Sequence, residues 1–251
     1  MRKALSLLLL LGAAVVPALA QRYIGDIEVS ADSKTIPVRV TSAAPELRAL
    51  ALRAFGAHGR YRLVASGYAY DIAFAPAGSA AVRVTVTKGA GGAAVLSEVV
   101  SAPTANQALL RAADLAVEKT NGLGLRGFFS SRLAFISERT GRTEVYDSDL
   151  FFSPGEVKQL THDRAEALFP RWSPDGARII YTSFYKGGMA DIYLLDAATG
   201  TRTSFASFQG TNLSARFSPS GRQVAMVLTG SGTPEIWTSN AEGRDLVRRT
   251  H

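Results

Sequence analysis

The chain has 251 residues, of which 28 are basic and 21 are acidic, so its formal net charge is +7. Beyond residue 20 the basic side chains are scattered, with Arg248-Arg249 the only adjacent pair, which is typical of a solvated surface and not of an ordered nucleic-acid stripe. The sequence contains no cysteine. This excludes disulfides, thiolate metal sites and cysteine nucleophiles.

Residues 1–20 have the pattern of a secretory signal peptide. Arg2 and Lys3 precede an apolar run, and Ala18-Leu19-Ala20 supplies the small-x-small motif after which a signal peptidase cleaves. The apolar run is too short to cross a bilayer as a mature helix, and no cysteine at the cleavage point offers a lipid anchor. We therefore expect a mature chain that begins at residue 21 or 22 and is soluble outside the cytoplasm.

Residues 21–122 are expected to form an α/β domain whose strands show period-2 alternation of apolar residues. Pro37 marks the second strand as an edge strand, because proline cannot donate a hydrogen bond to a sheet ladder. Glycines at 89, 91 and 92 indicate a turn that joins the last two strands as a hairpin. The predicted strands are residues 27–29, 36–40, 61–65, 68–74, 82–87 and 95–100.

Two helices are predicted in the same domain. The first begins at Pro45, carries one apolar stripe at helical spacing, and ends where Gly56 and Gly59 can take the left-handed conformation. The second begins after Thr104, whose hydroxyl can cap the first turn while the Gln107 side chain reaches back to it. Two helices against four to six strands make a domain of ordinary size.

After residue 130 the chain contains a repeat whose copies lie 45 residues apart. Residues 171–176 (Arg-Trp-Ser-Pro-Asp-Gly) align with residues 216–221 (Arg-Phe-Ser-Pro-Ser-Gly), and the alignment continues downstream. Trp172 and Phe217 are expected to be buried anchors between neighbouring units, and the Pro-Asp-Gly segment a tight turn. A strand-rich repeat of this length has the size of a four-stranded propeller blade.

This repeat resembles the WD40-like repeat of the TolB family, the periplasmic component of the Tol–Pal envelope system. Residues 120–123 and 125–128 precede a strand at residues 132–137, much as the family's linker precedes its first blade. The resemblance implies an α/β N-terminal domain followed by a partial β-propeller of about two and a half blades. In this reading residues 123–130 are the linker and residues 131–251 are the incomplete propeller repeats.

The resemblance also implies a protein that binds partners and is not an enzyme. In the family, the mature N-terminus docks a TolA-like inner-membrane protein, and one propeller face receives a Pal-like lipoprotein of the outer membrane. Carried over by position, these roles fall on the N-terminal segment and on loops at residues 209–214 and 166–169. The expected partner-binding residues are Arg22, Tyr23, Ile24, Asp26, Ile27, Val29, Thr211, Asn212, Leu213 and Ser214. Asn212 fits the family pattern, whereas Thr211 and Leu213 stand where the family has His and Gly.

The residues themselves offer no catalytic or metal-binding constellation, so no cofactor, metal or nucleic acid is expected. The three histidines, His58, His162 and His251, lack the spacing of metal ligands. Asp147 and Asp149 lack the context of a calcium loop and are expected in an exposed turn. The chain has no Gly-x-Ser-x-Gly nucleophile motif. The alternative function is the gating propeller of a secreted serine peptidase whose hydrolase domain is missing from this chain.

A complete propeller of the family has six blades, so the sequence is expected to be a fragment or a truncated product. Its first blade, residues 132–161, lacks an incoming strand of its own. Each blade of a propeller buries its faces against its neighbours. The last blade is therefore expected to expose an apolar face that includes Val224, Met226, Ile236 and Trp237.

Overall fold

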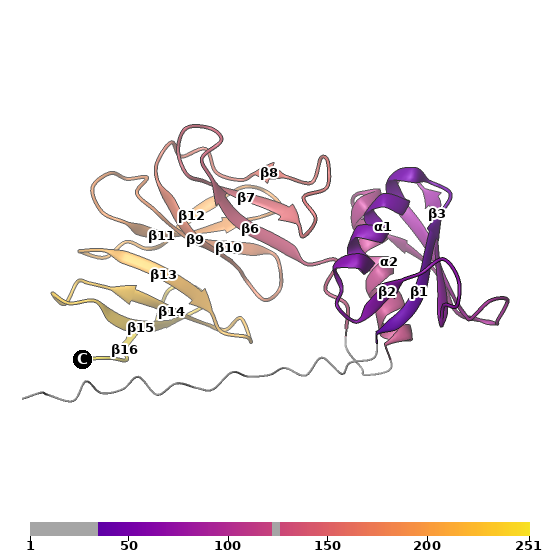
Figure 1. Cartoon of the computed structure of the whole chain (residues 1–251). Coiled ribbons are helices and arrows are strands. Elements are labelled where there is room, and N and C mark those ends of the chain that lie inside the picture. Colours follow the sequence, from indigo (N-terminus) through magenta and orange to yellow (C-terminus); the bar gives the residue numbers. More distant parts are fainter. Residues whose placement is uncertain (1–34, 122–125) are drawn as a thin grey trace, which may run out of the picture. The chain divides into compact units, whose positions relative to one another are not determined.

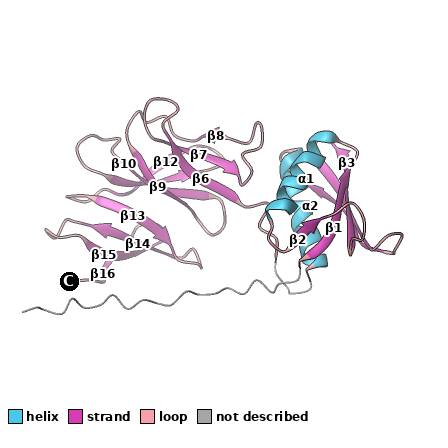
Figure 2. Ribbon diagram, viewed as in Figure 1, coloured by secondary structure: helices cyan, strands magenta, loops and turns pink. Residues whose placement is uncertain are grey.

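Two α-helices and sixteen β-strands are formed by residues 35–121 and 126–251, the residues that the computed structural model describes (Figures 1 and 2). The expected signal peptide and the strand predicted at residues 27–29 lie outside them. The helices are α1 (Pro45–Ala57) and α2 (Ala105–Thr120). The first five strands are β1 (Ile36–Ser42), β2 (Tyr61–Leu63), β3 (Tyr70–Gly78), β4 (Ala81–Lys88) and β5 (Ala94–Ser101). The strands that follow α2 are β6 (Arg132–Ser137), β7 (Glu144–Asp149), β8 (Lys158–Gln159), β9 (Ala167–Trp172), β10 (Arg178–Ser183), β11 (Asp191–Asp196), β12 (Arg202–Ala206), β13 (Asn212–Phe217), β14 (Gln223–Leu228), β15 (Glu235–Asn240) and β16 (Val247–Arg248).

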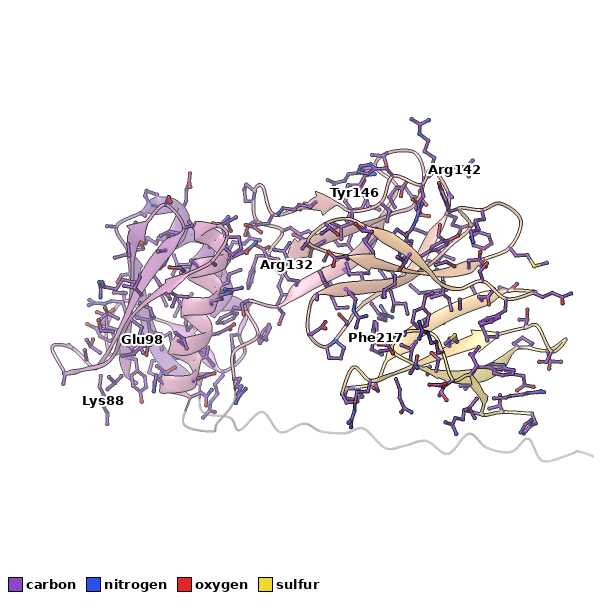
Figure 3. All side chains as sticks on the ribbon, turned by 180° about the vertical axis from the view of Figure 1, so that it is seen from behind. Lys88, Glu98, Arg132, Arg142, Tyr146 and Phe217 are labelled. Atoms are coloured by element: carbon purple, nitrogen blue, oxygen red, sulfur yellow. The ribbon has the colours of Figure 1, made fainter. Side chains whose placement is uncertain are left out.

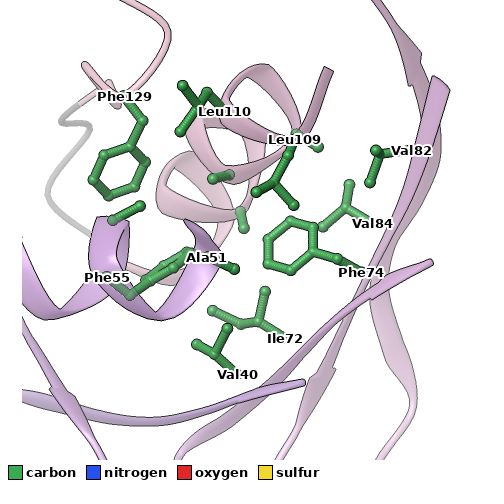
Figure 4. Close-up of a cluster of buried hydrophobic side chains, with 14 of the residues drawn as sticks. Val40, Ala51, Phe55, Ile72, Phe74, Val82, Val84, Leu109, Leu110 and Phe129 are labelled. Carbon is green, nitrogen blue, oxygen red and sulfur yellow. The ribbon is translucent and has the colours of Figure 1, made fainter. Parts of the chain in front are cut away.

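Strands β1–β5 form one sheet in the order β2-β1-β3-β4-β5, with β1 parallel to both of its neighbours and the rest antiparallel. Both helices pack on the same face of this sheet and on each other, α1 mainly over β1 and β2 and α2 over β4 and β5. Side chains that alternate along the strands, such as Val40, Ile72 and Val84, are buried beneath the helices (Figure 4). The number of strands and helices lies within the predicted range.

Two details of this sheet were predicted wrongly. Strand β1 is not an edge strand, because it lies between β2 and β3. Pro37 is tolerated there since it is the second residue of the strand, where its carbonyl still accepts the Ala69 N–H at 2.8 Å. Helix α1 does not end on a left-handed glycine: Gly56 lies inside the helix, and His58 follows the last turn with φ −86° and ψ 105°. An extended residue therefore ends the helix.

The N-terminus of α2 is capped by Thr104 as predicted, since the Gln107 backbone N–H donates to Thr104 Oγ1 at 3.2 Å. The Gln107 side chain does not reach back to the cap. Its Nε2 donates instead to Glu156 Oε2 at 2.8 Å, and Thr104 Oγ1 donates to Glu156 Oε1 at 2.5 Å. Glu156 is 2% exposed and also forms an ion pair with Arg132 Nη1 at 3.0 Å. Hydrogen bonds to an ionised carboxylate are stronger than those between neutral groups, so the Glu156 carboxylate takes the side chains of both Thr104 and Gln107.

Replacing Glu156 with glutamine is expected to lower the free energy of unfolding by about 1–3 kcal/mol at pH 7, because a neutral amide replaces the carboxylate that pairs with Arg132. The loss is not larger because Arg132 retains Asp147 as a second partner. Burial raises the pKa of Glu156, but the hydrogen bonds from Thr104, Gln107 and Arg132 outweigh burial and hold that pKa below its usual value. A depressed pKa in the folded state contributes stability above the unfolded pKa of about 4.3 and loses it as the pH falls. The stability difference between wild type and Glu156→Gln should therefore shrink in urea titrations at pH 3–4. The matched control is Glu118→Gln on the exposed side of α2, and a pH-independent difference would contradict the prediction.

Strands β6–β16 form three antiparallel sheets with the orders β6-β7-β8, β9-β10-β11-β12 and β13-β14-β15-β16. The first sheet has three strands and lacks an incoming strand, as expected. The middle sheet packs against both others, through Ile179 and Tyr181 on one face and Ile180 and Ile192 on the other. The two repeat aromatics, Trp172 and Phe217, are partly buried members of these two interfaces. The repeat therefore produces stacked sheets, with one aromatic anchor in each of the two interfaces.

The turn of the repeat has the expected chemistry. Gly176 adopts φ 69°, and the carboxylate of Asp175 accepts hydrogen bonds from the Ser173 hydroxyl at 2.5 Å and the Ala177 N–H at 3.0 Å. These hydrogen bonds, with Ser173 first among them, hold the pKa of Asp175 below its usual value. Asp175 is thus fully used in turning the chain between β9 and β10.

The last sheet exposes a different apolar face from the one predicted. Val224 is fully buried and Met226 is 2% exposed, because both side chains point toward the middle sheet. The alternate residues of the strands face away from it, and there Ile236 is 47% and Val247 is 44% exposed. Trp237 is partly buried on the inner side. The alternation of a strand places residues 224 and 226 on one face and their neighbours on the other, so only Ile236 of the four predicted residues is strongly exposed.

Asp147 and Asp149 do not lie in an exposed turn, which corrects the expectation from the sequence. Both belong to β7 and are 8% and 2% exposed. Asp147 forms an ion pair with Arg132 on the neighbouring strand β6, and Figure 3 shows Arg132 on this first sheet. Asp149 Oδ1 accepts the N–H groups of Phe151 at 2.9 Å and Ser153 at 3.0 Å. Partners of this kind offset the cost of burying the carboxylates. A local sequence pattern does not reveal such partners.

Candidate partner-binding site

The residues predicted to bind partners divide into two groups. Thr211, Asn212, Leu213 and Ser214 lie in the described part of the chain, at the end of the loop before β13 and in the first residues of that strand. The other group, within residues 22–29, lies outside the described residues, and its role remains a prediction. The geometry of the first group can be followed residue by residue.

The side chain of Asn212 is fully buried and organises the loop. Its Nδ2 donates to the Phe208 carbonyl oxygen at 2.9 Å and to Asp191 Oδ1 at 3.3 Å, and its Oδ1 accepts the Phe208 N–H at 3.1 Å. The backbone N–H of Asn212 donates to the Ala190 carbonyl oxygen at 2.9 Å. With no exposed surface, the side chain supports the loop from beneath and leaves surface contacts to its neighbours.

The same loop is tied to the loop between β14 and β15. The Thr211 N–H donates to Thr229 Oγ1 at 2.7 Å, and the Thr229 N–H donates to the Thr211 carbonyl oxygen at 3.1 Å. Gly210 has φ 86°, and a Cβ at this position would lie 2.5 Å from Thr229 Oγ1, so only glycine fits. The side chains that point outward from this pinned loop are Phe208, which is 42% exposed, and Gln209.

Ser214 and Phe169 share an unusual backbone conformation. Each adopts φ 55°, and the pairing of β13 with β14 and of β9 with β10 shifts register around these positions. Non-glycine residues in this region are uncommon and persist where surrounding contacts hold them. Ser214 is held by its N–H, which donates to Thr182 Oγ1 at 3.3 Å. Both predicted binding segments therefore carry the same bulge, and Phe169 stands 46% exposed on one of them.

A buried acid is the first residue of one inner strand in each sheet, namely β7, β11 and β15, a feature that the sequence analysis missed. Each acid accepts a hydrogen bond from a hydroxyl that lies just after the last strand of its sheet. The donor–acceptor pairs are Thr161–Glu144 at 2.6 Å, Ser207–Asp191 at 2.8 Å, and Thr250–Glu235. The alignment of Asp191 with Glu235 in the repeat was the available signal. These bonds fix the end of each sheet next to the loops of the predicted binding face.

Arg202 of β12 lies between an acid and two aromatic rings. It forms an ion pair with Asp163, and its guanidinium carbon lies 3.8 Å from the ring centroid of Tyr185 and 5.2 Å from that of Tyr193. Burial lowers the pKa of Arg202, but its interactions with Tyr181 and Asp163 outweigh burial and raise that pKa above its usual value. The Arg202 guanidinium therefore stays protonated, and its charge is paired with Asp163 within the protein.

The described residues contain neither a metal cluster nor a helix suited to a membrane. Within residues 35–121 and 126–251, no three His, Cys, Asp or Glu side chains gather closely enough to hold a metal ion. Neither α1 nor α2 is long and apolar enough to cross a bilayer.

Arg142 projects from the loop between β6 and β7 (Figure 3), near His162 and Arg164 around a hollow of about 340 Å³. The side chains of Arg142, His162 and Arg164 are exposed to solvent, whereas Glu144 at the same hollow is buried.

The family model described as the TolB β-propeller domain matches residues 118–251, just over half of the chain. The chain belongs to the TolB propeller family. The resemblance noted in the sequence is thereby confirmed for the region that carries the repeats.

The chain is also similar, to different extents, to individual known proteins. A curated TolB homologue from Chlorobaculum tepidum is 32% identical over 120 residues, which cover 48% of this chain and 27% of the relative. The crystal structure of TolB from Acinetobacter baumannii superposes with a TM-score of 0.71 at 22% identity, covering 87% of this chain and 61% of that one. Dipeptidyl peptidase 4 from Porphyromonas gingivalis gives a TM-score of 0.40, covers 74% of this chain and 26% of that one, and is 14% identical. The chain spans about a quarter of the curated relative's length.

Thr211 and Leu213 are the two loop positions at which the sequence was expected to depart from the TolB-family pattern. The hydrogen bonds of Thr211 to Thr229 use only its backbone N–H and carbonyl groups. A different side chain at this position therefore leaves the loop in place. The departure changes the surface chemistry of the loop without changing how Asn212 and Gly210 hold it.

Proposed function

We propose that this protein is a non-catalytic adaptor of the Tol–Pal envelope system, located in the periplasm after removal of residues 1–20. It binds a TolA-like inner-membrane protein through the N-terminal segment that contains Arg22 and Val29. It binds a Pal-like outer-membrane lipoprotein through the loop at residues 209–214. The observation that carries the proposal is the family match over residues 118–251, together with a loop that Asn212 and Thr229 hold in one conformation. A pinned loop binds with little loss of conformational entropy.

The three stacked sheets are interpreted as blades of an incomplete propeller, and residues 123–130 as the linker that follows an N-terminal domain of residues 21–122. The equal arrangement of β9–β12 and β13–β16 supports this interpretation. In a blade of this kind, loops before the first strand lie on one face of the ring. Both predicted binding segments, residues 166–169 and 209–214, span the end of such a loop and the first residues of the strand that follows it.

The alternative function, a gating propeller of a secreted serine peptidase, is not favoured. The peptidase structures that resemble the chain have TM-scores below 0.5, a similarity too low to support an argument. The family model that matches the chain describes TolB propellers and not peptidases.

The proposal is tested by separating the two partner sites. Deleting residues 22–30 is expected to abolish capture by the C-terminal domain of a TolA-like protein, while Kd for a Pal-like lipoprotein stays within about twofold. The reciprocal variant Thr211→Arg places a bulky cation in the centre of the loop, and it is expected to raise Kd for the lipoprotein by about tenfold or more. Pull-down and calorimetric titration measure the two effects.

Circular dichroism of both variants checks that the sheets remain folded. Unchanged capture of the TolA-like domain by the deleted chain would remove the first assignment. Equal lipoprotein affinity of wild type and Thr211→Arg would remove the second.

A further inference from the structure

The sheets β9–β12 and β13–β16 are equivalent residue by residue, which allows the same place to be compared in both. Tyr193 pairs with Ser204 in the first sheet, and Trp237 pairs with Arg248 in the second, so Tyr193 and Trp237 correspond. By the same register Arg202 corresponds to the residue just before β16, Leu246.

The loops between the second and third repeat strands correspond as well. The Gly187 N–H donates to the Phe184 carbonyl oxygen at 2.9 Å, and the Gly232 N–H donates to the Thr229 carbonyl oxygen at 2.9 Å. Tyr185, which follows Phe184, therefore corresponds to Gly230. The two sheets thus place an aromatic residue and a glycine at one and the same position.

In the sheet β9–β12 this position is occupied by the side chains of the sheet itself. The ring of Tyr185 stands edge-on to Tyr193, with centroids 6.4 Å apart and planes at 88°. The guanidinium of Arg202 lies over the Tyr185 ring and pairs with Asp163 from the preceding loop. An aromatic ring and a cation therefore fill the place.

In the sheet β13–β16 the same place is open. A pocket of about 380 Å³ lies there, and its lining side chains carry no charge. Its lining residues are Phe208, Gln209, Leu228, Gly230, Ser231, Trp237 and Leu246. Glycine at 230 removes the ring that Tyr185 supplies, and Leu246 replaces the cation of Arg202. A Cβ at position 230 would lie 2.8 Å from the Gln209 carbonyl oxygen, so the loop itself requires the position to stay empty.

The walls of the pocket indicate what fits it. Phe208 presents an aromatic face that is 42% exposed, and Leu228 and Leu246 supply aliphatic surface. The Trp237 Nε1–H is buried without a hydrogen-bond partner among the described residues. Because this nitrogen is shielded from solvent, Trp237 contributes the apolar surface of its ring to the pocket wall. The pocket adjoins the pinned loop through Phe208 and Gln209.

We propose that this pocket receives one aromatic side chain of the protein segment that binds to the loop at residues 209–214, as the ring of Tyr185 fills the matching place in the neighbouring sheet. This inference rests on the proposed function and names the anchor of the partner. An aromatic ring fits best, because it can pack on Phe208 as the Tyr185 ring stands against Tyr193 in the neighbouring sheet. Apolar pockets of this kind that bury one aromatic anchor supply much of the affinity of an interface.

The test uses Leu246→Trp, which fills the pocket from within, and Val247→Trp as its matched control. Successive residues of a strand face opposite sides, and Val247 is 44% exposed, so the control adds the same bulk outside the pocket. The expected result is a Kd for the Pal-like lipoprotein that is about tenfold or more higher for Leu246→Trp and unchanged within about twofold for Val247→Trp.

A second measurement needs no partner protein. N-acetyl-L-tyrosinamide, at concentrations on the order of 1 mM, is expected to give ligand-observed NMR saturation transfer with wild type and Val247→Trp but not with Leu246→Trp. N-acetyl-L-alaninamide is expected to give none. Phe208→Ala, which removes an exposed wall of the pocket without touching the core, should weaken the tyrosinamide signal and thereby covers the case in which Leu246→Trp fails to fold.

The outcomes distinguish the two proposals. If wild type does not bind the lipoprotein but the tyrosinamide signal is lost in Leu246→Trp and weakened in Phe208→Ala, the proposed function fails and the pocket stands as an aromatic site. If lipoprotein binds and neither variant changes its Kd or the tyrosinamide signal, the pocket assignment is overturned and the proposed function stands.

Discussion

Asn212→Ala is expected to lower the free energy of unfolding by about 2–4 kcal/mol, because the side chain is fully buried and its partners have no water to replace it. Its removal leaves the Phe208 N–H and carbonyl groups and Asp191 Oδ1 without their hydrogen bonds to it. Guanidinium titrations measure the loss. The affinity for the Pal-like lipoprotein is also expected to fall under conditions where the variant is fully folded, since residues 208–211 lose the hydrogen bonds that fix them.

Two control variants separate the causes. Thr211→Ala removes only a side chain, whereas the contacts of this residue with Thr229 are made by its backbone groups. The free energy of unfolding is therefore expected to stay within about 0.5 kcal/mol of wild type. Asn212→Asp keeps the shape but places a carboxylate 3.3 Å from Asp191 Oδ1, where like charges repel. Its deficit should therefore narrow as the pH falls toward 4. A change below 0.5 kcal/mol for Asn212→Ala would show that the loop does not depend on this side chain.

The elements of the fold could be predicted from the sequence because their signals are local. The stripe of α1 and the buried face of β4 follow from periods of 3.6 and 2, and the sheets are buried where those periods place them. The 45-residue repeat also predicted the turn at Asp175 and the matching strand order of the last two sheets. In each case the information lies within a few residues, or within one repeat, of the feature.

The polar interior could not be predicted, because its partners are far apart in the sequence. Glu156 takes both side chains of the α2 cap from 49 and 52 residues away, and Asp147 is buried only because Arg132 lies on the next strand. Charged residues are usually exposed, so a local pattern places them in turns. Only the fold shows that each of these carboxylates has a partner.

The candidate site falls between these two cases. The family resemblance directed attention to Asn212, yet the structure buries this side chain and leaves Phe208 and Gln209 as the outward surface of the loop. The pocket beside it depends on a difference between repeats: Gly230 aligns with Tyr185, and Leu246 with Arg202. That alignment is present in the sequence. Its meaning needs the structure, because only the structure shows that Tyr185 contacts Arg202 in one sheet and that Gly230 and Leu246 line a pocket in the other.

Phe129→Ala is expected to have the largest effect on stability, about 3–5 kcal/mol, because it removes a fully buried ring from the core that the helices and the five-stranded sheet share (Figure 4). The Phe129 centroid lies 5.4 Å from that of Phe55 and 5.5 Å from that of His58. Its backbone N–H donates to Asp114 Oδ1 at 2.8 Å, which fixes the ring above α2. Residue 129 thus belongs to the core of the five-stranded sheet, although it lies within the segment expected to be a linker. Urea unfolding followed by circular dichroism measures the loss.

The neighbouring residue supplies the control. Phe128 is 47% exposed and also contacts His58, at 5.5 Å between centroids, so Phe128→Ala is expected to cost about 1 kcal/mol or less. The two variants should also differ at His58, whose pKa is held below its usual value mainly by burial. Opening the core with Phe129→Ala admits water to the imidazole and should return that pKa toward its ordinary value of about 6.5. NMR titration of His58 follows this change directly. Equal stability losses in the two variants, with no movement of the His58 pKa, would show that Phe129 is not part of the core that covers this histidine.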